Sequence, residues 1–362
     1  MSSECKSAAR YSGTDHVADF FDFWRLMWPI DGVWSLSPPT EAREESDPLA
    51  NLSSMQNLRI ALATLWLYER RAETKEMTTP VLIVAPFALH DAAIADFAKD
   101  HSLVESLARG GVDWLALTFW KSASSEMRDY GIDAYLSDLN VAIDDLGGRA
   151  SLIGLCQGGW LAAAYAARFP QKVIKLVAVG APIDLAAGPS QITLSVARTP
   201  PKVFQRLVEL GGGRVLGRMA QPFWEQTSGN AFVAEEALQS DPGVEMKAKF
   251  SVWNARTVDL PGRYFLETAE WLFRENRLAE NNFPALGRVC DLRKIQCPIF
   301  VLAASDDEIV ATPQATALAQ LCPQAHLTVR VVPGKHLSLF MGRDTLSGVW
   351  KEIAVWLRDP AA

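Results

Sequence analysis

Short apolar runs alternate with amphipathic stretches over much of the chain, and this alternation predicts the fold. Brief, almost wholly apolar runs of the kind seen in buried strands occur at 80–85, 112–119, 150–155, 173–179, 298–304 and 327–332. Amphipathic stretches that predict helices lie between or after them, at 102–109, 132–146, 157–168, 312–321 and 346–357. Strand–helix alternation with right-handed crossovers predicts an α/β fold with a mostly parallel, doubly wound sheet.

Two segments depart from this alternation and divide the chain. Residues 1–75 predict an N-terminal helical region, with helices over 17–28 and 55–73 and a Ser-, Pro- and Glu-rich loop at 35–47. Residues 184–291 hold apolar helical stretches, prolines and no convincing strand, so they predict a helical insertion that acts as a lid. The α/β core is then expected over 76–183 and 292–362.

Composition narrows the class of protein. Hydrophobic residues make up 49% of the 362 residues and charged residues 21%, which predicts a large buried core. A net charge of -7 without a basic cluster argues against nucleic acid as a partner. We expect no secretory signal and no membrane span, because no apolar stretch is long enough. The five cysteines form no metal-binding motif, so free thiols in a reducing compartment and no metal site are expected.

The strongest chemical signal is the hexapeptide Gly-Leu-Cys-Gln-Gly-Gly at 154–159, between a predicted strand and a predicted helix. This is the context of a nucleophile elbow, with Cys156 in place of the usual serine. The free N–H groups at the helix start favour the thiolate, and the N–H of Gln157 would be one oxyanion donor. The alternative is a cysteine that is merely packed at the end of a strand.

A nucleophile of this kind needs a histidine base and a carboxylate that orients it, in the chain order nucleophile, acid, histidine. Asp307, just after a predicted strand, is the expected acid, with Asp306 as the alternative. His336, in the loop after the last predicted strand, is the expected base, since the other histidines fit this order less well. The second oxyanion donor is expected in the loop after the first core strand, from Phe87 or Ala88.

Over residues 80–357 the chain resembles the polyhydroxyalkanoate synthases, members of the α/β-hydrolase superfamily, and above all the short class whose catalytic subunit works with a second subunit. The resemblance rests on the cysteine hexapeptide, on residues 166–173 and 181–184, and on Trp253-Asn254 and Leu-Pro-Gly at 260–262 in the predicted lid. It places the family's catalytic cysteine, aspartate and histidine on Cys156, Asp307 and His336.

This resemblance implies an acyltransferase. Cys156 would take the acyl group of a 3-hydroxyacyl-CoA as a thioester and pass it to a polyester hydroxyl, with Asp307 also helping to activate that hydroxyl. The CoA thioester is a substrate, and no cofactor is implied. A cytoplasmic, granule-associated homodimer with a second subunit as partner is the expected setting.

The chain also departs from the family pattern. His90 to Ile94 replace a longer stretch after the first core strand, Arg256 stands where the family has an aspartate, and Trp160 is bulky where a small residue is usual. We therefore expect substrate contacts from Trp160, His90, Trp253 and Asn254. Features around His90 also resemble intracellular polyhydroxybutyrate depolymerases, so a cysteine-dependent hydrolase or thioesterase stays open as an alternative. A non-catalytic granule-binding module is a third reading, which the complete Cys–Asp–His set argues against.

Overall fold

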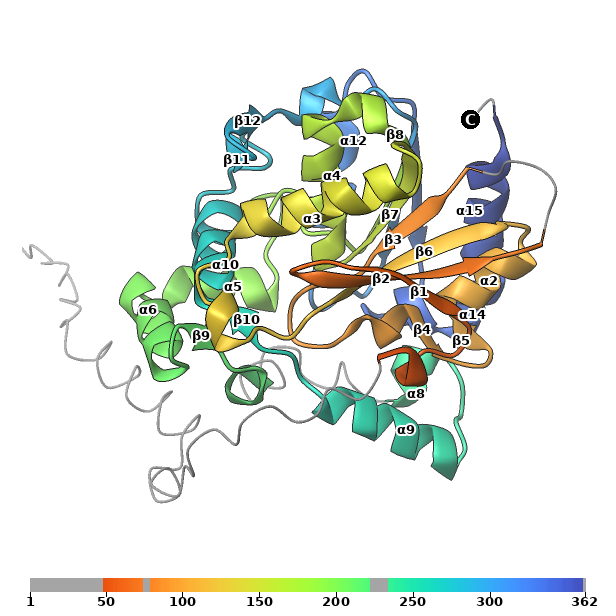
Figure 1. The fold of residues 1–362 in the computed structure, drawn as a ribbon, viewed down its shortest axis with the longest axis horizontal. Coiled ribbons are helices and arrows are strands. Elements are labelled where there is room, and N and C mark those ends of the chain that lie inside the picture. The colour runs from red at the N-terminus through yellow and green to blue at the C-terminus, as the bar shows by residue number, and fades with distance from the viewer. Residues whose placement is uncertain (1–47, 74–78, 222–233, 361–362) are drawn as a thin grey trace, which may run out of the picture. The chain divides into compact units, whose positions relative to one another are not determined.

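An eight-stranded sheet forms the centre of the structure, a computed structural model that describes residues 48–73, 79–221 and 234–360. Across the sheet the order is β1 (Asn57–Ala61), β2 (Leu65–Arg71), β6 (Trp114–Trp120), β3 (Val81–Val84), β7 (Ala150–Leu155), β8 (Val173–Val179), β13 (Ile299–Ala304) and β14 (Leu327–Val332). The strands from β6 to β14 are parallel, and β1 and β2 are antiparallel to their neighbours. The predicted mostly parallel sheet is confirmed (Figure 1).

Helices cover both faces of this sheet because the chain changes direction across it. From β3 it passes through α2 (Leu103–Arg109) to β6, then returns through α3 (Ile132–Asp145) to β7 and continues through α4 (Gln157–Arg168) to β8. Right-handed crossovers that run in opposite directions place their helices on opposite faces. The last helix, α15 (Val349–Arg358), packs against α2. Every residue of β7 and of β13 is accordingly buried.

The change of direction falls between β3 and β7, and this position determines where a ligand would bind. In open parallel sheets the loops at the carboxyl ends of the strands separate at such a point and leave a crevice. The loop after β3 and the turn after β7 both lie there, and the loops that follow β13 and β14 leave from the same edge of the sheet. Four segments far apart in the sequence therefore meet at one edge of the sheet.

The prediction of an N-terminal helical region over residues 1–75 is wrong for its second half. Instead of a helix over 55–73, β1 and β2 form an antiparallel hairpin that pairs through β2 with β6. Leu65 and Leu67 point into the core two residues apart, which is the period of a strand. The core sheet therefore begins at Asn57 rather than at residue 76. The helix predicted over 17–28 and the loop at 35–47 lie outside the described residues.

The segment between β8 and β13 lies outside the sheet, and its described part is largely helical. Its helices are α5 (Gln191–Arg198), α6 (Pro201–Leu210), α8 (Ala234–Leu238), α9 (Val244–Ala255), α10 (Gly262–Glu267), the π-helix η7 (Thr268–Arg274) and the short η8 (Leu292–Lys294). The expectation of no strand is corrected by two short antiparallel pairs, β9 (Arg214–Val215) with β10 (Leu260–Pro261) and β11 (Phe283–Ala285) with β12 (Arg288–Cys290).

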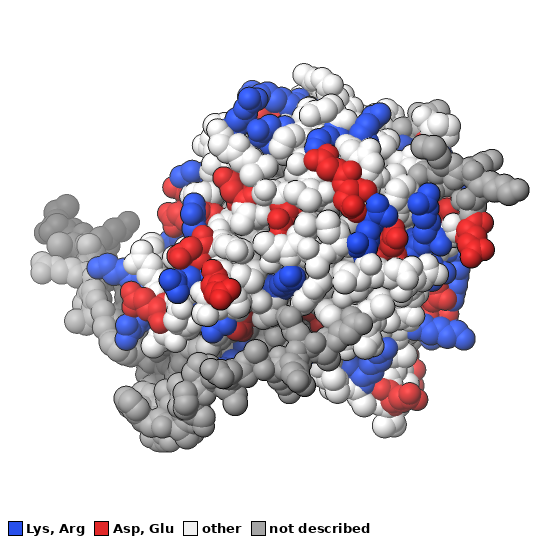
Figure 2. All heavy atoms as spheres, viewed as in Figure 1, with Lys and Arg blue, Asp and Glu red and all other residues white. Residues whose placement is uncertain are grey.

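The described surface carries charges of both signs. Figure 2 shows Lys and Arg intermixed with Asp and Glu on the face drawn. Among the helices of the described residues, none combines the length and the apolar character that crossing a bilayer requires.

Candidate active site

Cys156 occupies the sharp turn between β7 and α4. Its backbone has φ 49° and ψ -118°, a conformation that a residue with a side chain rarely adopts. The Cys156 N–H donates to the carbonyl of Val179 at 2.9 Å, and its carbonyl accepts from the N–H of Gly159 at 2.8 Å. These bonds hold the strained turn, so the sulfur is fixed at the carboxyl end of β7. The strand–turn–helix context predicted for the hexapeptide is present.

The glycines of the hexapeptide allow α4 to begin directly beside β3 and β7. A Cβ at Gly158 would lie 2.1 Å from the carbonyl oxygen of Val84, and a Cβ at Gly154 would lie 2.5 Å from the Cα of Gly159. Neither distance is compatible with a side chain. The close approach brings the first N–H groups of α4, which have no carbonyl one turn earlier in the helix, up to the loop that follows β3.

His336 and Asp307 come together from the loops after β14 and β13. His336 Nδ1 lies 2.8 Å from Asp307 Oδ2, and the side chains are 4% and 1% exposed. The other carboxylate oxygen of Asp307 accepts the N–H groups of Ile309 and Val310 at 2.9 and 2.8 Å. Asp306 is exposed, and its carboxylate accepts from the neighbouring Ser305 instead. Of the two predicted acids, Asp307 is therefore the one that contacts His336.

The electrostatic setting of His336 links it to Cys156. Burial alone would lower the pKa of His336, but the charges of Asp307 and Cys156, with their hydrogen bonds to the ring, raise that pKa well above its ordinary value. Since Nδ1 faces Asp307, Nε2 is the ring nitrogen left for the sulfur. The arrangement therefore lets the imidazole accept the proton of the Cys156 thiol, as activation of a cysteine nucleophile requires.

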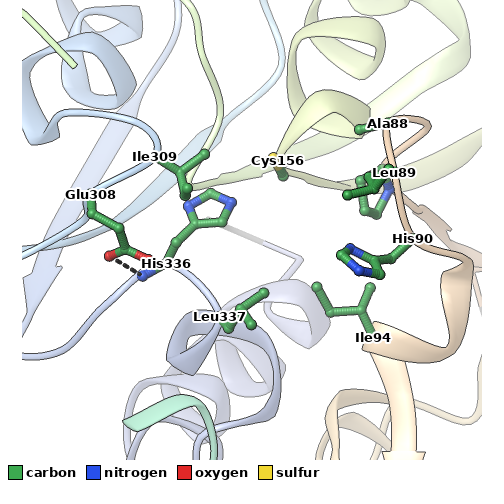
Figure 3. Close-up of a pocket in the computed structure, with 10 residues that line it drawn as sticks. Ala88, Leu89, His90, Ile94, Cys156, Glu308, Ile309, His336 and Leu337 are labelled. Carbon is green, nitrogen blue, oxygen red and sulfur yellow. Dashed lines mark hydrogen bonds between the residues drawn. The ribbon is translucent and has the colours of Figure 1, made fainter. Parts of the chain in front are cut away.

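Cys156 and His336 open into one pocket, drawn in Figure 3. Its walls come from the loop after β3, the turn after β7 and the loops after β13 and β14. The residues that line it are Pro86, Ala88, Leu89, His90, Ile94, Cys156, Glu308, Ile309, His336 and Leu337. Most of these side chains are apolar, so a group held there is shielded from water and electrostatic interactions inside are strengthened.

The two candidates for the second oxyanion donor differ in where they lie. Ala88 lines the pocket with Cys156. The Phe87 side chain is 3% exposed, stacks on Tyr135 with ring centroids 4.7 Å apart, and is not among the residues that line the pocket. Trp120 Nε1 donates to the carbonyl of Ala85 at 2.7 Å and so fixes the start of this loop. Gln157 is the first residue of α4, as predicted from the sequence.

The four predicted substrate contacts divide into two groups. His90 lines the pocket, stacks on Trp253 with ring centroids 4.6 Å apart, and has Nε2 3.0 Å from the carbonyl of Asn254. Trp253 and Asn254 thus reach the pocket through His90. Trp160 is fully buried, packs on Phe283 and donates to the Gln157 side chain, so its predicted place against the substrate is not what the structure shows.

Two of the departures noted in the sequence meet in space. Asp91, in the stretch that replaces the longer family segment, forms an ion pair with Arg256, with Arg256 Nε 2.8 Å from Asp91 Oδ2. Burial raises the pKa of Asp91, and the Arg256 charge opposes this effect. A bridge between His90 and Thr257 joins the same two segments. The loop beside the pocket is therefore attached to the helical insertion by an ion pair and a β-bridge.

Glu308 is a pocket residue that sequence reasoning passed over. It lines the same pocket as Cys156, and its Oε2 accepts the backbone N–H of His336 at 3.3 Å. The signal that could have found it is its position next to Asp307, in a loop at the end of a strand. The hydrophobic pattern carries no information about which way a loop side chain points.

The other cysteines in the described part of the chain are also free thiols, but they do not line the pocket. Burial raises the pKa of Cys290 to about 12, of Cys297 to about 11 and of Cys322 to about 12, so they remain protonated. Among the residues described, His, Cys, Asp and Glu form no cluster that could hold a metal ion. Cys156 is the thiol that faces the pocket.

Comparisons with known proteins place these observations in a family. A family model described as alpha/beta hydrolase fold matches residues 111–342, more than half of the chain. The match includes Cys156, Asp307 and His336 and the whole helical insertion.

Curated relatives give a narrower likeness, and six of them are named as poly(3-hydroxyalkanoate) polymerase or its PhaC subunit. The PhaC subunit of Haloferax mediterranei is 24% identical over 81% of this chain and 61% of its own length. That of Allochromatium vinosum is 23% identical over 82% of this chain and 85% of its own length. The resemblance inferred from the sequence is thus confirmed.

Solved structures confirm the fold class. A monoacylglycerol lipase from Paleococcus ferrophilus has a TM-score of 0.54 and 14% identity, and covers 81% of this chain and 98% of its own. An esterase from Thermogutta terrifontis has a TM-score of 0.52 and 17% identity, and covers 82% of this chain and 95% of its own. At these identities the likeness concerns the fold.

Proposed function

The chain belongs to the α/β-hydrolase fold family, and we propose that within it the protein is an acyltransferase of the poly(3-hydroxyalkanoate) polymerase type. It would form a thioester on Cys156 from a 3-hydroxyacyl-CoA and transfer the acyl group to the hydroxyl of a polyester chain. The observation that carries the proposal is the His336 ring, which is bonded to Asp307 and opens with the Cys156 sulfur into one pocket.

The first half-reaction begins with a proton transfer. His336 Nε2 takes the proton of the Cys156 thiol, and the sulfur attacks the thioester carbonyl carbon. The oxyanion formed is held by the N–H groups of Gln157 and Ala88; Ala88 is chosen over Phe87 because it lines the pocket. The carbon–sulfur bond to CoA then breaks, and the CoA sulfur leaves with the proton from His336.

The second half-reaction uses the same groups. The hydroxyl oxygen of the polyester attacks the acyl carbon, its proton passes to His336, and the bond from carbon to the Cys156 sulfur breaks as the sulfur recovers that proton. Water in place of the hydroxyl would yield free acid. The apolar lining of the pocket favours the hydroxyl of an apolar chain over water.

The proposal extends to the surroundings of the enzyme. The CoA thioester is a substrate, and no resident cofactor takes part. We propose association with polyester granules, a homodimer, and a second subunit as partner, as in the class of synthases that the chain resembles. The shared name of the relatives, polymerase, supports an acyltransferase-type enzyme.

The test is to give purified full-length protein 3-hydroxybutyryl-CoA and to follow CoA release together with turbidity from polymer. Release of CoA with formation of polymer is the expected result. Release of CoA without polymer would instead identify a hydrolase on the same fold. The Cys156→Ala variant is the control, and activity in that variant, or none in the natural protein, would overturn the proposal.

A further inference from the structure

The carboxylate of Asp307 is buried and bonded within the protein. One oxygen accepts two backbone N–H groups and the other faces His336, and the side chain is 1% exposed. Asp307 is also not among the residues that line the pocket, so a substrate hydroxyl held there would not meet its carboxylate. The expectation from the family resemblance, that Asp307 also helps to activate the hydroxyl, is therefore not favoured by this geometry.

The neighbouring carboxylate, Glu308, is placed differently. Oε2 accepts from the backbone of His336, while Oε1 is buried and has no hydrogen-bond partner among the described residues. Glu308 lines the pocket that holds Cys156, and Figure 3 shows its carboxylate at the backbone of His336, with the His336 ring between it and Cys156. A buried acceptor without a partner is unfavourable, and a ligand hydroxyl would relieve it.

Other polar side chains of the pocket already have roles or partners. Cys156 and His336 carry the chemistry, and His90 is bonded to the Asn254 carbonyl and stacked on Trp253. The rest of the lining is apolar. Glu308 is thus the group on this wall that can give a hydroxyl a polar partner in an otherwise apolar surrounding.

We propose that Glu308 binds the 3-hydroxyl of the acyl group as it is loaded onto Cys156, and so selects hydroxyacyl over plain acyl thioesters. This assignment rests on the proposed function. The 3-hydroxyl is two carbons from the thioester carbonyl, and Glu308 lines the same pocket as the Cys156 sulfur. Burial is the main cause that raises the pKa of Glu308, as expected for a carboxyl in a largely apolar pocket.

The experiment compares 3-hydroxybutyryl-CoA with butyryl-CoA, which lacks the hydroxyl, by the rate at which each labels Cys156 in the full chain. The readout is the ratio of the two rates within one protein preparation, so a reduced folded fraction cancels. In Glu308→Leu, which keeps the size but not the polar atoms, we expect the ratio to fall roughly tenfold. In Glu308→Gln, which can still bond a hydroxyl, it should stay within about threefold of the natural value.

The outcomes separate this inference from the function on which it rests. The matched control is Asp306→Asn, because Asp306 is an exposed carboxylate two positions before Glu308. This variant should leave the ratio of the two rates unchanged. If Glu308→Leu slows both thioesters by the same factor, Glu308 only supports the His336 loop and the assignment falls while the acyltransferase survives. If neither thioester labels Cys156 in the natural protein, the proposed function and the assignment fall together.

Discussion

Replacing Asp307 by asparagine tests how the carboxylate controls His336. The two N–H groups of Ile309 and Val310 need an acceptor, so the amide oxygen of the new side chain would take the place of Oδ1. Its NH₂ group would then face Nδ1 of His336, where the carboxylate oxygen now lies at 2.8 Å. A donor at that position requires Nδ1 to be unprotonated, which leaves the proton on Nε2. The ring could then no longer accept the thiol proton.

The size of the effect has two parts. Loss of a hydrogen bond to a charged group costs about 1.5–3 kcal/mol, which is roughly 10- to 150-fold in rate. The inverted tautomer adds to this, and in the serine enzymes the same change lowers the rate by about 10⁴. We expect Asp307→Asn to slow the loading of Cys156 by roughly 10³–10⁴, without preventing folding.

The assay is the loss of thioester absorbance on mixing enzyme and 3-hydroxybutyryl-CoA, with circular dichroism to confirm folding. Asp306→Asn is the control, because that carboxylate is exposed and bonded to Ser305, and its rate should stay within about twofold of the natural one. A folded Asp307→Asn enzyme that keeps more than about a tenth of the natural rate would refute the reasoning.

Three further predictions concern stability. Burial lowers the pKa of His90 to about 4, so on acidification the unfolded chain binds a proton at His90 before the folded protein does. Between about pH 6.5 and 4, the free energy of unfolding measured in urea should therefore fall by about 3 kcal/mol more in the natural protein than in His90→Gln. Equal losses in the two proteins would contradict this. Gly158→Ala should lower the free energy of unfolding by about 1–3 kcal/mol and slow acylation, whereas Gly243→Ala, whose added Cβ meets no atom within 4 Å, should stay within about 0.5 kcal/mol. In a double-mutant cycle, the effects of Asp91→Asn and Arg256→Gln on the free energy of unfolding should be coupled by about 1–2 kcal/mol. Additive effects would rule out the ion pair as a link between the loop and the helical insertion.

The parallel part of the fold could be predicted from the sequence because its signals are local and redundant. α4 and β8 have the predicted bounds, since a glycine pair opens the helix and Pro170 follows its end. The β1–β2 hairpin could not be predicted in this way, because the spacing of the apolar residues from 57 to 71 suits a helix as well as a strand. Pairing with β6, a contact distant in sequence, decides between them.

The active site likewise has parts that the sequence predicts and parts that it does not. The positions of Cys156, Asp307 and His336 were predictable because a strand–turn–helix motif and a fixed chain order define them. The direction of a side chain within a helix or loop has no such marker. Trp160 was expected at the substrate but is buried against Phe283, and Glu308 was not singled out although it lines the pocket. Both positions are set by packing between segments distant in sequence.

The central claim is that the Cys156 sulfur carries the acyl group, and mass spectrometry of the intact and digested protein after brief mixing with 3-hydroxybutyryl-CoA tests it most directly. We predict a mass increase equal to one or more hydroxybutyryl units on the peptide that contains Cys156, absent in Cys156→Ala. Turnover of the thioester with no adduct on Cys156 under acid quench, or an adduct that persists in Cys156→Ala, would contradict the account.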